Sequence, residues 1–252
     1  MDKTQKTSPI LVNELPDSVI EQVLCIDEVT EQNPRWELLS HSDHGRCYKF
    51  TPKPNAPSWF VRWGYNYSWN HFRQAILGQD EATNDWRNTG HAERHYIPVI
   101  HYRLLGTPRL LTGSLDTLLV TEYRQSTRTL KDFFSDPNVN PMNREEVLIK
   151  LGELLGHIHT EGMAHGHFEL ENVLIQYDDA TRLIITDWYD MKLVAPEDLL
   201  KLKRDVRSLL HSMHEIDLTD ERLSSFMDSY SRKRPWLKEA QSDLLSSLHQ
   251  PN

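Results

Sequence analysis

The chain has 252 residues, 38% of them hydrophobic and 26% charged, which is enough for one large core or two smaller lobes. A formal net charge of −9 argues against general nucleic-acid binding, and no apolar stretch approaches the roughly 18 residues that a membrane-spanning helix needs. Two cysteines, Cys25 and Cys47, are too few for a disulfide framework, and the first residues lack the apolar core of a signal peptide. The sequence therefore predicts a soluble, cytoplasmic protein without a transmembrane segment.

The first half of the chain is predicted to be mainly β-structure. After a flexible N-terminal segment over 1–15, residues 17–24 have the apolar spacing of a short helix. The runs RCYKF (46–50) and WFVRW (59–63) are rich in aromatic and β-branched residues, and the Pro-rich TPKPNAP between them predicts a hairpin turn. The run LLVTEY, over 118–123, is typical of a buried strand.

The second half changes to helical spacing. Residues 144–160 carry apolar side chains three and four positions apart, with Asn143 as the expected N-cap and Gly162 as the expected stop. Two short strands, 173–176 and 183–186, are expected next, joined by a turn with the sequence YDDATR.

Three further helices are expected after these strands. Pro196 suits the first turn of one of them, and 220–230 and 235–248 fit the other two. The apolar face of the helix after Pro196 is expected to consist of Leu199, Leu200, Val206, Leu209, Leu210 and Met213. Strands first and helices later predict an α+β fold with two lobes, a mainly β N-lobe over 16–124 and a mainly α C-lobe over 125–252.

The loop HGHFELEN, residues 165–172, lies between the long helix and the two short strands. Its last residue, Asn172, and Asp187, which follows the second strand, are expected to point into one cleft. Either residue alone suits a turn cap or a strand end. Together they offer the hard oxygen ligands that Mg²⁺ prefers, as phosphoryl transfer requires. The layout therefore predicts a phosphoryl-transfer site that holds Mg²⁺.

Several motifs carry a resemblance to a known family. HGHFELENVLI…RLIITDWYDM resembles the H-x-D-x-x-x-x-N loop and D-F-G-type Asp of protein-kinase-like folds, and its details are most similar to the Kdo/WaaP lipopolysaccharide kinase family. LLVTEYRQSTRTLKDFF is similar to that family's strand–hinge–helix segment, DWRNTGHAERHYIPVIHY to its helix followed by a strand, and KLKRDVRSLLHSM to the helix after its catalytic loop. The resemblance implies a two-lobed protein-kinase-like fold, with the nucleotide on the N-lobe side and the catalytic loop and metal on the C-lobe side. The competing interpretation is an unrelated α+β domain whose motifs match by chance.

The resemblance also implies roles for residues on the nucleotide side. A lysine is expected on the third strand to bind the phosphates, but Arg62 stands there, and Lys49 on the preceding strand is the alternative. The helix carboxylate that pairs with this cation is either Glu81 or Asp85. The expected nucleotide-binding residues are thus Gly45, Lys49, Arg62, Glu81, Asp85 and Glu122, with Gly45 in the turn over the phosphates and Glu122 in the hinge segment.

On the catalytic side, the resemblance assigns Asn172 and Asp187 to the metal and Asp205 to anchoring the backbone of the catalytic loop. His167 stands where the family carries the Asp that orients the attacking hydroxyl. Neutral histidine can act as a general base, and Glu169 and Glu171 in the same loop are further candidates. Two hypotheses follow: an enzyme in which one of these residues replaces the Asp, or a pseudokinase that serves as a nucleotide-binding or scaffold module.

The acceptor is expected to be small. No long activation segment fits between Asp187 and the helix near Pro196, which favours a sugar acceptor over a protein. The resemblance implies transfer of the γ-phosphate of ATP to a sugar hydroxyl of a lipid-linked or lipopolysaccharide-core acceptor. The protein would then meet this partner as a peripheral protein at the inner membrane surface.

Overall fold

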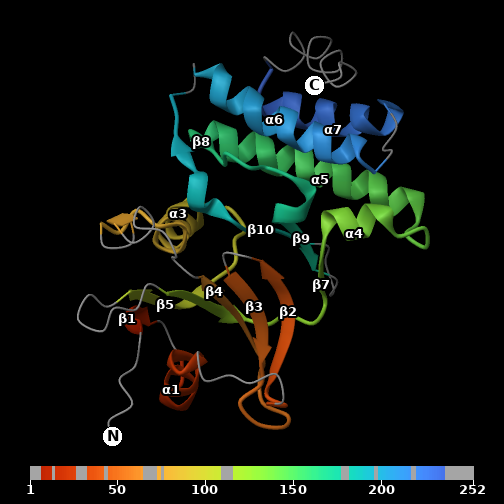
Figure 1. The fold of residues 1–252 in the computed structure, drawn as a ribbon. Coiled ribbons are helices and arrows are strands. Elements are labelled where there is room, and N and C mark those ends of the chain that lie inside the picture. Colours follow the sequence, from red (N-terminus) through yellow and green to blue (C-terminus); the bar gives the residue numbers. More distant parts are fainter. Residues whose placement is uncertain are drawn as a thin grey trace, which may run out of the picture. The chain divides into compact units, whose positions relative to one another are not determined.

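The computed structural model describes residues 7–12, 15–26, 33–42, 45–64, 73–74, 77–108, 116–176, 182–195, 198–216 and 220–235. The chain divides into two compact units (Figure 1), which are described in turn. Unit 1 comprises Met1–Arg87 and Ile100–Gln125, and unit 2 comprises Asn88–Val99 and Ser126–Asn252. A large antiparallel sheet forms unit 1 and helices dominate unit 2, so the predicted α+β class is confirmed.

Unit 1 is built on a six-stranded antiparallel sheet. Its strands in spatial order are β1 (Thr7–Val12), β5 (Tyr102–Pro108), β6 (Thr117–Glu122), β4 (Trp59–Gly64), β3 (Gly45–Phe50) and β2 (Trp36–Ser42). The β3–β4 hairpin is the one predicted from the two aromatic runs, with Tyr48 opposite Val61. The strand predicted over 118–123 is β6.

One face of this sheet is covered by α1 (Asp17–Leu24), whose predicted bounds are confirmed. Alternate residues of β3 and β4 are buried, as period-two side-chain geometry requires. The resulting core contains Val19, Val23, Leu24, Trp36, Tyr48, Phe50, Trp59, Val61, Leu104, Leu118 and Val120.

The N-terminal residues differ from the expectation. Residues 1–15 are expected to be flexible, but Thr7–Val12 form β1, which pairs with β5 and satisfies its backbone groups there. The register shifts between Pro9 and Leu11. Proline interrupts a strand pattern and the partner strand lies far along the chain, so the local sequence does not reveal this strand.

Unit 2 contains most of the helices and two small sheets. The helices are α4 (Leu130–Ser135), α5 (Pro141–Thr160), α6 (Leu199–His214) and α7 (Asp220–Lys233), with the C-terminal part of α3 (Glu81–Arg94). One sheet has the order β10 (Arg182–Ile185), β9 (Val173–Gln176), β7 (Thr127–Thr129), and the other joins β11 (Lys192–Leu193) to β8 (Met163–Ala164). Both strands predicted after the loop, β9 and β10, are confirmed.

The long helix α5 lies beside α7 in the core of unit 2 (Figure 1). Glycine at 152 permits this approach, because a Cβ there would lie 2.1 Å from Ser229 Oγ and 2.4 Å from the backbone oxygen of Phe226. The predicted helix and its stop at Gly162, whose φ is +71°, are confirmed. The predicted cap is wrong: Asn140, not Asn143, caps α5, because its Oδ1 accepts from the Met142 N–H and Pro141 suits the first turn.

Helices α6 and α7 confirm the expected elements with two qualifications. Leu200 is 81% exposed, so it does not belong to the buried face expected for α6. Leu202, two positions further along the helix, is fully buried instead. Pro196 and the helix expected over 235–248 lie outside the described residues. Over the parts of the chain that the structure describes, no helix is long and apolar enough to cross a membrane.

The segment 88–99 is expected in the N-lobe, but the structure groups it with unit 2. Asn88 Nδ2 donates a 2.8 Å hydrogen bond to the carbonyl of Trp188, and His95 Nδ1 lies 2.8 Å from Glu161 Oε2. Val99 forms a parallel bridge with Ile185. These contacts come from residues distant in sequence, so the chain composition around 88–99 could not indicate them.

Candidate functional site

The loop 165–172 is held on its buried side by Asp205 of α6. Asp205 is fully buried, and its Oδ2 accepts a 2.6 Å hydrogen bond from the His165 N–H while Oδ1 accepts a 2.8 Å bond from the Gly166 N–H. These bonds give a buried carboxylate the donors that it needs. The carboxylate thereby fixes the backbone at the point where the loop begins.

A second buried contact supports Asp205. His159 of α5 lies with its Nε2 3.2 Å from Asp205 Oδ2 and its Nδ1 2.5 Å from the Tyr230 hydroxyl of α7. Because Asp205 accepts from its other partners, Nε2 carries the proton and Nδ1 accepts from Tyr230. Burial lowers the pKa of His159, which favours this neutral form. His159 and Tyr230 were not among the predicted site residues, because nothing in the nearby sequence marks them as partners of the loop.

Asn172 and Asp187 come from neighbouring ends of the loop and of β10. The Asn172 side-chain nitrogen donates a 2.8 Å bond to the His167 carbonyl, which fixes the amide and leaves Oδ1 as its oxygen ligand. The Asn172 carbonyl accepts a 3.0 Å bond from the N–H of Thr186, the residue before Asp187. The backbone of Asn172 is therefore joined to the residue directly before Asp187, which brings the two candidate metal ligands close along the chain path.

Asp187 adopts a strained backbone conformation, with φ 59° and ψ 51°. A left-handed conformation is uncommon for a residue other than glycine, and such residues cluster at functional sites. Asp187 begins the short 3₁₀ turn Trp188–Asp190. Its conformation redirects the chain directly after β10, and this observation supports a functional role for the carboxylate.

The described residues contain no group of three or more His, Cys, Asp or Glu arranged to hold a metal ion. Mg²⁺ usually takes one or two protein oxygen ligands and completes its shell with water and substrate phosphates. The amide oxygen of Asn172 and the carboxylate of Asp187 therefore fit Mg²⁺ bound together with a nucleotide. They do not fit a metal enclosed by protein ligands alone.

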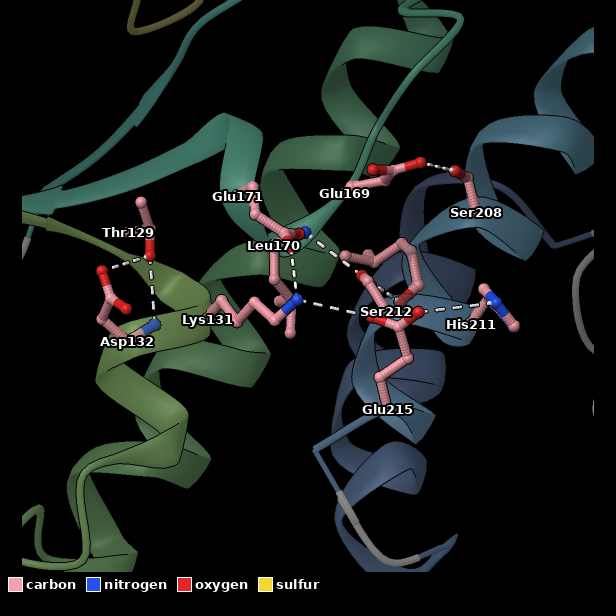
Figure 2. Close-up of polar contacts among 11 residues, drawn as sticks. Thr129, Lys131, Asp132, Glu169, Leu170, Glu171, Ser208, His211, Ser212 and Glu215 are labelled. Carbon is pink, nitrogen blue, oxygen red and sulfur yellow. Dashed lines mark hydrogen bonds and ion pairs between the residues drawn. The ribbon is translucent and has the colours of Figure 1, made fainter. Parts of the chain in front are cut away.

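The two glutamates of the loop contact neighbouring helices (Figure 2). Glu169 Oε1 accepts a 2.8 Å bond from Ser208 Oγ of α6, and Glu171 Oε1 lies 2.5 Å from Lys131 Nζ of α4. Among the described residues no hydrogen bond or ion pair joins either glutamate to His167. Glu169 thus ties the loop to α6, and its catalytic role stays a prediction.

His167 lies against two residues, Tyr189 and Asp190, that were not among the predicted site residues. Its ring stacks on Tyr189, with centroids 5.6 Å apart and planes at 25°, and its Nε2 lies 3.6 Å from Asp190 Oδ2. Asp190 stands three residues after Asp187, in the sequence DWYD. The sequence shows this spacing, but the spacing by itself does not indicate a contact with His167. The 3₁₀ turn Trp188–Asp190 brings the Asp190 carboxylate close to the loop.

In unit 1, the structure distinguishes the two candidate cations and the two candidate carboxylates. Arg62 of β4 donates a 2.7 Å bond to Asp85 Oδ2 of α3, and the Tyr102 hydroxyl donates a 2.8 Å bond to the same oxygen. Asp85 is fully buried, so a cationic partner offsets the cost of burying it. Lys49 instead lies 3.0 Å from Glu37 and over the ring of Tyr123.

A hollow of about 240 Å³ lies beside the end of β2, the start of β3 and the start of α3. It is lined by Ser40, His41, Ser42, Gly45, Arg46, Cys47, Arg62, Trp63, Gly64, Glu81, Ala82 and Thr117. Gly45, Arg62 and Glu81 thus meet in one place, whereas Lys49 and Glu122 do not line it; Glu122 pairs with Arg103 at 3.1 Å. A Cβ at 45 would lie 2.6 Å from the Trp63 carbonyl oxygen, so close strand packing by itself requires this glycine.

Comparison with known proteins gives a family. The profile described as "Lipopolysaccharide kinase (Kdo/WaaP) family" matches residues 66–230, which is more than half of the chain. Among curated proteins no sequence matches significantly. A solved structure described as "WaaP in complex with acyl carrier protein" superposes with a TM-score of 0.63 at 16% identity, covering 94% of this chain and 95% of that one.

The structural similarity shows a kinase-like fold, which excludes a chance match of isolated motifs, and the profile covers the loop 165–172, Asp187 and Asp205. The chain therefore belongs to the lipopolysaccharide kinase (Kdo/WaaP) family.

Proposed function

We propose that the protein is an active kinase that transfers the γ-phosphate of ATP to a hydroxyl group of a lipopolysaccharide-core sugar. The family supports sugar-kinase chemistry and gives no support to the pseudokinase alternative. The acceptor would be lipid-linked, and the protein would meet it as a peripheral protein at the cytoplasmic face of the inner membrane.

The backbone hydrogen bond from the Thr186 N–H to the Asn172 carbonyl, directly before Asp187, carries this proposal. Oxygen ligands from these two side chains suit Mg²⁺, which in such reactions neutralises charge on the nucleotide phosphates. Asn172 is oriented for this role because its amide nitrogen is already bonded to the His167 carbonyl. Asp205 would act by holding the loop that carries Asn172, without touching the substrate.

The residues proposed for the nucleotide phosphates lie in unit 1. Arg62 supplies the cation, and its ion pair with Asp85 and its place in the hollow support this role over Lys49. Arginine can bind a phosphate with two parallel hydrogen bonds, so its charge and geometry both suit the task. Residues 16–124 would thus provide the nucleotide-binding side and 125–252 the catalytic side.

His167 would receive the proton of the acceptor hydroxyl. The unprotonated nitrogen of a neutral imidazole can accept a proton, as in enzymes that use histidine as a general base. The other candidates in the loop, Glu169 and Glu171, are bonded to Ser208 and Lys131. Balanced transfer then breaks the bond between the γ-phosphorus and ADP, forms the bond to the acceptor oxygen and leaves the proton on His167.

Calorimetry of ATP binding, with and without Mg²⁺, tests this proposal first. We expect Mg²⁺ to strengthen binding at least about tenfold, and Asp187→Ala to remove that gain. Arg62→Ala should weaken binding about tenfold or more, whereas Lys49→Ala should change it less than about twofold.

Phosphoryl transfer is then measured from radiolabelled ATP to purified lipopolysaccharide that carries the core sugars. Asp187→Ala should abolish transfer, and Asp198→Ala, which removes an exposed carboxylate that pairs with Lys201, should not. Absence of binding at millimolar ATP, or undiminished transfer by the Asp187 variant, would contradict the proposal.

A further inference from the structure

The carboxylate of Asp190 lies against the loop 165–172 at the place where the family's catalytic aspartate is missing. Its Oδ2 is 3.6 Å from His167 Nε2, with the two side chains about one third exposed. This distance is longer than a hydrogen bond, so the two groups are close polar neighbours, and catalytic hydrogen bonds that are long in a ligand-free structure often tighten only with substrate bound. Asp190 is therefore the carboxylate that acts on His167 among the described residues.

The loop backbone leaves space for Asp190. Gly166 has a φ of +93°, and a Cβ at that position would lie 2.9 Å from both the backbone oxygen and Oδ2 of Asp190. Glycine is thus needed twice, for the conformation and for the close approach. Because Gly166 has no side chain, the Asp190 carboxylate can reach the loop directly beside His167.

The turn that carries Asp190 is itself fixed. Asn88 Nδ2 donates to the carbonyl of Trp188 at 2.8 Å, and the indole N–H of Trp188 donates to the carbonyl of Ile185 at 3.3 Å. Tyr189, between Trp188 and Asp190, stacks on the His167 ring and limits its rotation. Two consecutive residues of one turn therefore contact the histidine, Tyr189 through the plane of its ring and Asp190 at its Nε2 edge.

Asp190 also has cationic neighbours, so the competing interpretation is a purely structural cluster of ion pairs. Lys192 Nζ lies 3.3 Å from Oδ1 and Arg204 is 4.0 Å from Oδ2. Exposed ion pairs of this kind contribute little to stability. They also leave Oδ2 nearer to His167 than to Arg204, so the cations do not displace the histidine contact. A purely structural ion-pair cluster would not depend on the state of the His167 ring.

We propose that Asp190 is a positioning residue that fixes the orientation and the tautomer of His167. With the proton held on Nε2 toward Asp190, Nδ1 keeps its lone pair, and no hydrogen bond among the described residues occupies Nδ1. That nitrogen then accepts the acceptor-hydroxyl proton as the phosphoryl group leaves ADP. The pairing replaces, with two residues, the single aspartate of the family motif, and its catalytic part rests on the proposed function.

The first test measures the His167 ring itself. Imidazole nitrogen–hydrogen correlation spectra of the ¹⁵N-labelled full chain, recorded at one fixed pH, give the tautomer, and the His167→Gln spectrum assigns the signals. We expect the Nε2–H form in the unaltered protein, a marked shift of the ¹⁵N signals in Asp190→Asn, and recovery in Asp190→Glu. Asp198→Asn serves as the matched control and should leave the signals in place. Unchanged His167 signals in Asp190→Asn would overturn the pairing.

The second test measures transfer from ATP to deep-core lipopolysaccharide by the same variants. Asp190→Asn should lower kcat about tenfold or more with the KM for ATP within about twofold, and Asp190→Glu should restore part of it. An unchanged kcat with altered ring signals would overturn the positioning role. If the unaltered protein transfers nothing while the ring signals respond, the pairing is supported and the proposed function is contradicted.

Discussion

The buried and exposed sides of the loop 165–172 follow different rules. On the buried side, Asp205, His159 and Tyr230 are almost fully enclosed, and each polar group meets a partner. On the exposed side, His167 and Asp190 keep about one third of their side chains in solvent. Buried polar groups must be satisfied, so their identity is fixed by their neighbours, whereas exposed groups can be exchanged at little cost. The buried contacts of the loop are therefore expected to tolerate substitution less well than the exposed contact between His167 and Asp190.

Removing the buried carboxylate should have the largest effect on stability. Asp205→Ala leaves the N–H groups of His165 and Gly166 and the Nε2–H of His159 without their acceptor. We expect the free energy of unfolding to fall by about 3–5 kcal/mol. Urea unfolding followed by circular dichroism measures it, with Asp198→Ala as the exposed control. A loss below about 1 kcal/mol would show that the buried side tolerates exchange as the exposed side does.

Two helical glycines extend the comparison to packing. Gly152→Ala in α5 forces a methyl group to within 2.4 Å of the Phe226 backbone oxygen, and we expect a loss of about 2–3 kcal/mol. Gly90→Ala in α3 meets nothing within 4 Å and should stabilise the protein by about 0.5–1 kcal/mol. Thermal unfolding of both variants tests this pair. Equal effects in the two variants would contradict the close approach of α5 and α7.

The smallest effect concerns pH. Burial lowers the pKa of His159 below its ordinary value of 6.5, so at mildly acidic pH the unfolded chain binds a proton that the folded chain does not. The free energy of unfolding should therefore fall as pH drops below about 6.5, with a contribution of at most about 1.4 kcal/mol per pH unit. His159→Gln removes this contribution, so its unfolding free energy should fall less steeply. Parallel curves for the two proteins would show that His159 does not titrate on unfolding.

Local sequence patterns predicted the elements that local forces determine. The helix over Asp17–Leu24, the β3–β4 hairpin and the two strands after the loop are correct because their apolar spacing and turn residues act within a few positions. The cap at Asn143 and the buried position of Leu200 are wrong. Such patterns do not show which of two nearby polar residues caps a helix. They also do not show how a helix is rotated against its neighbours.

The candidate site divides in the same way. Asn172 and Asp187 were predicted from the order of the motifs along the chain, which can be read from a single sequence. Their roles stay predictions. The choice of Asp85 over Glu81 beside Arg62 required the structure, because both residues face one side of the same helix four positions apart. Asp190 and Tyr230 were missed, because their partners lie 23 and 71 residues away and only folding brings them together.

The Tyr230–His159 bond has a consequence for how the protein is made. The loop 165–172 emerges from the ribosome well before Tyr230, which completes the buried side of that loop from 71 residues beyond His159. At ordinary translation speeds the interval is on the order of seconds, during which His159 lacks the Tyr230 hydroxyl that it contacts in the folded protein. The buried contacts of the loop therefore cannot all form until α7 has left the ribosome, so they are completed late in biosynthesis.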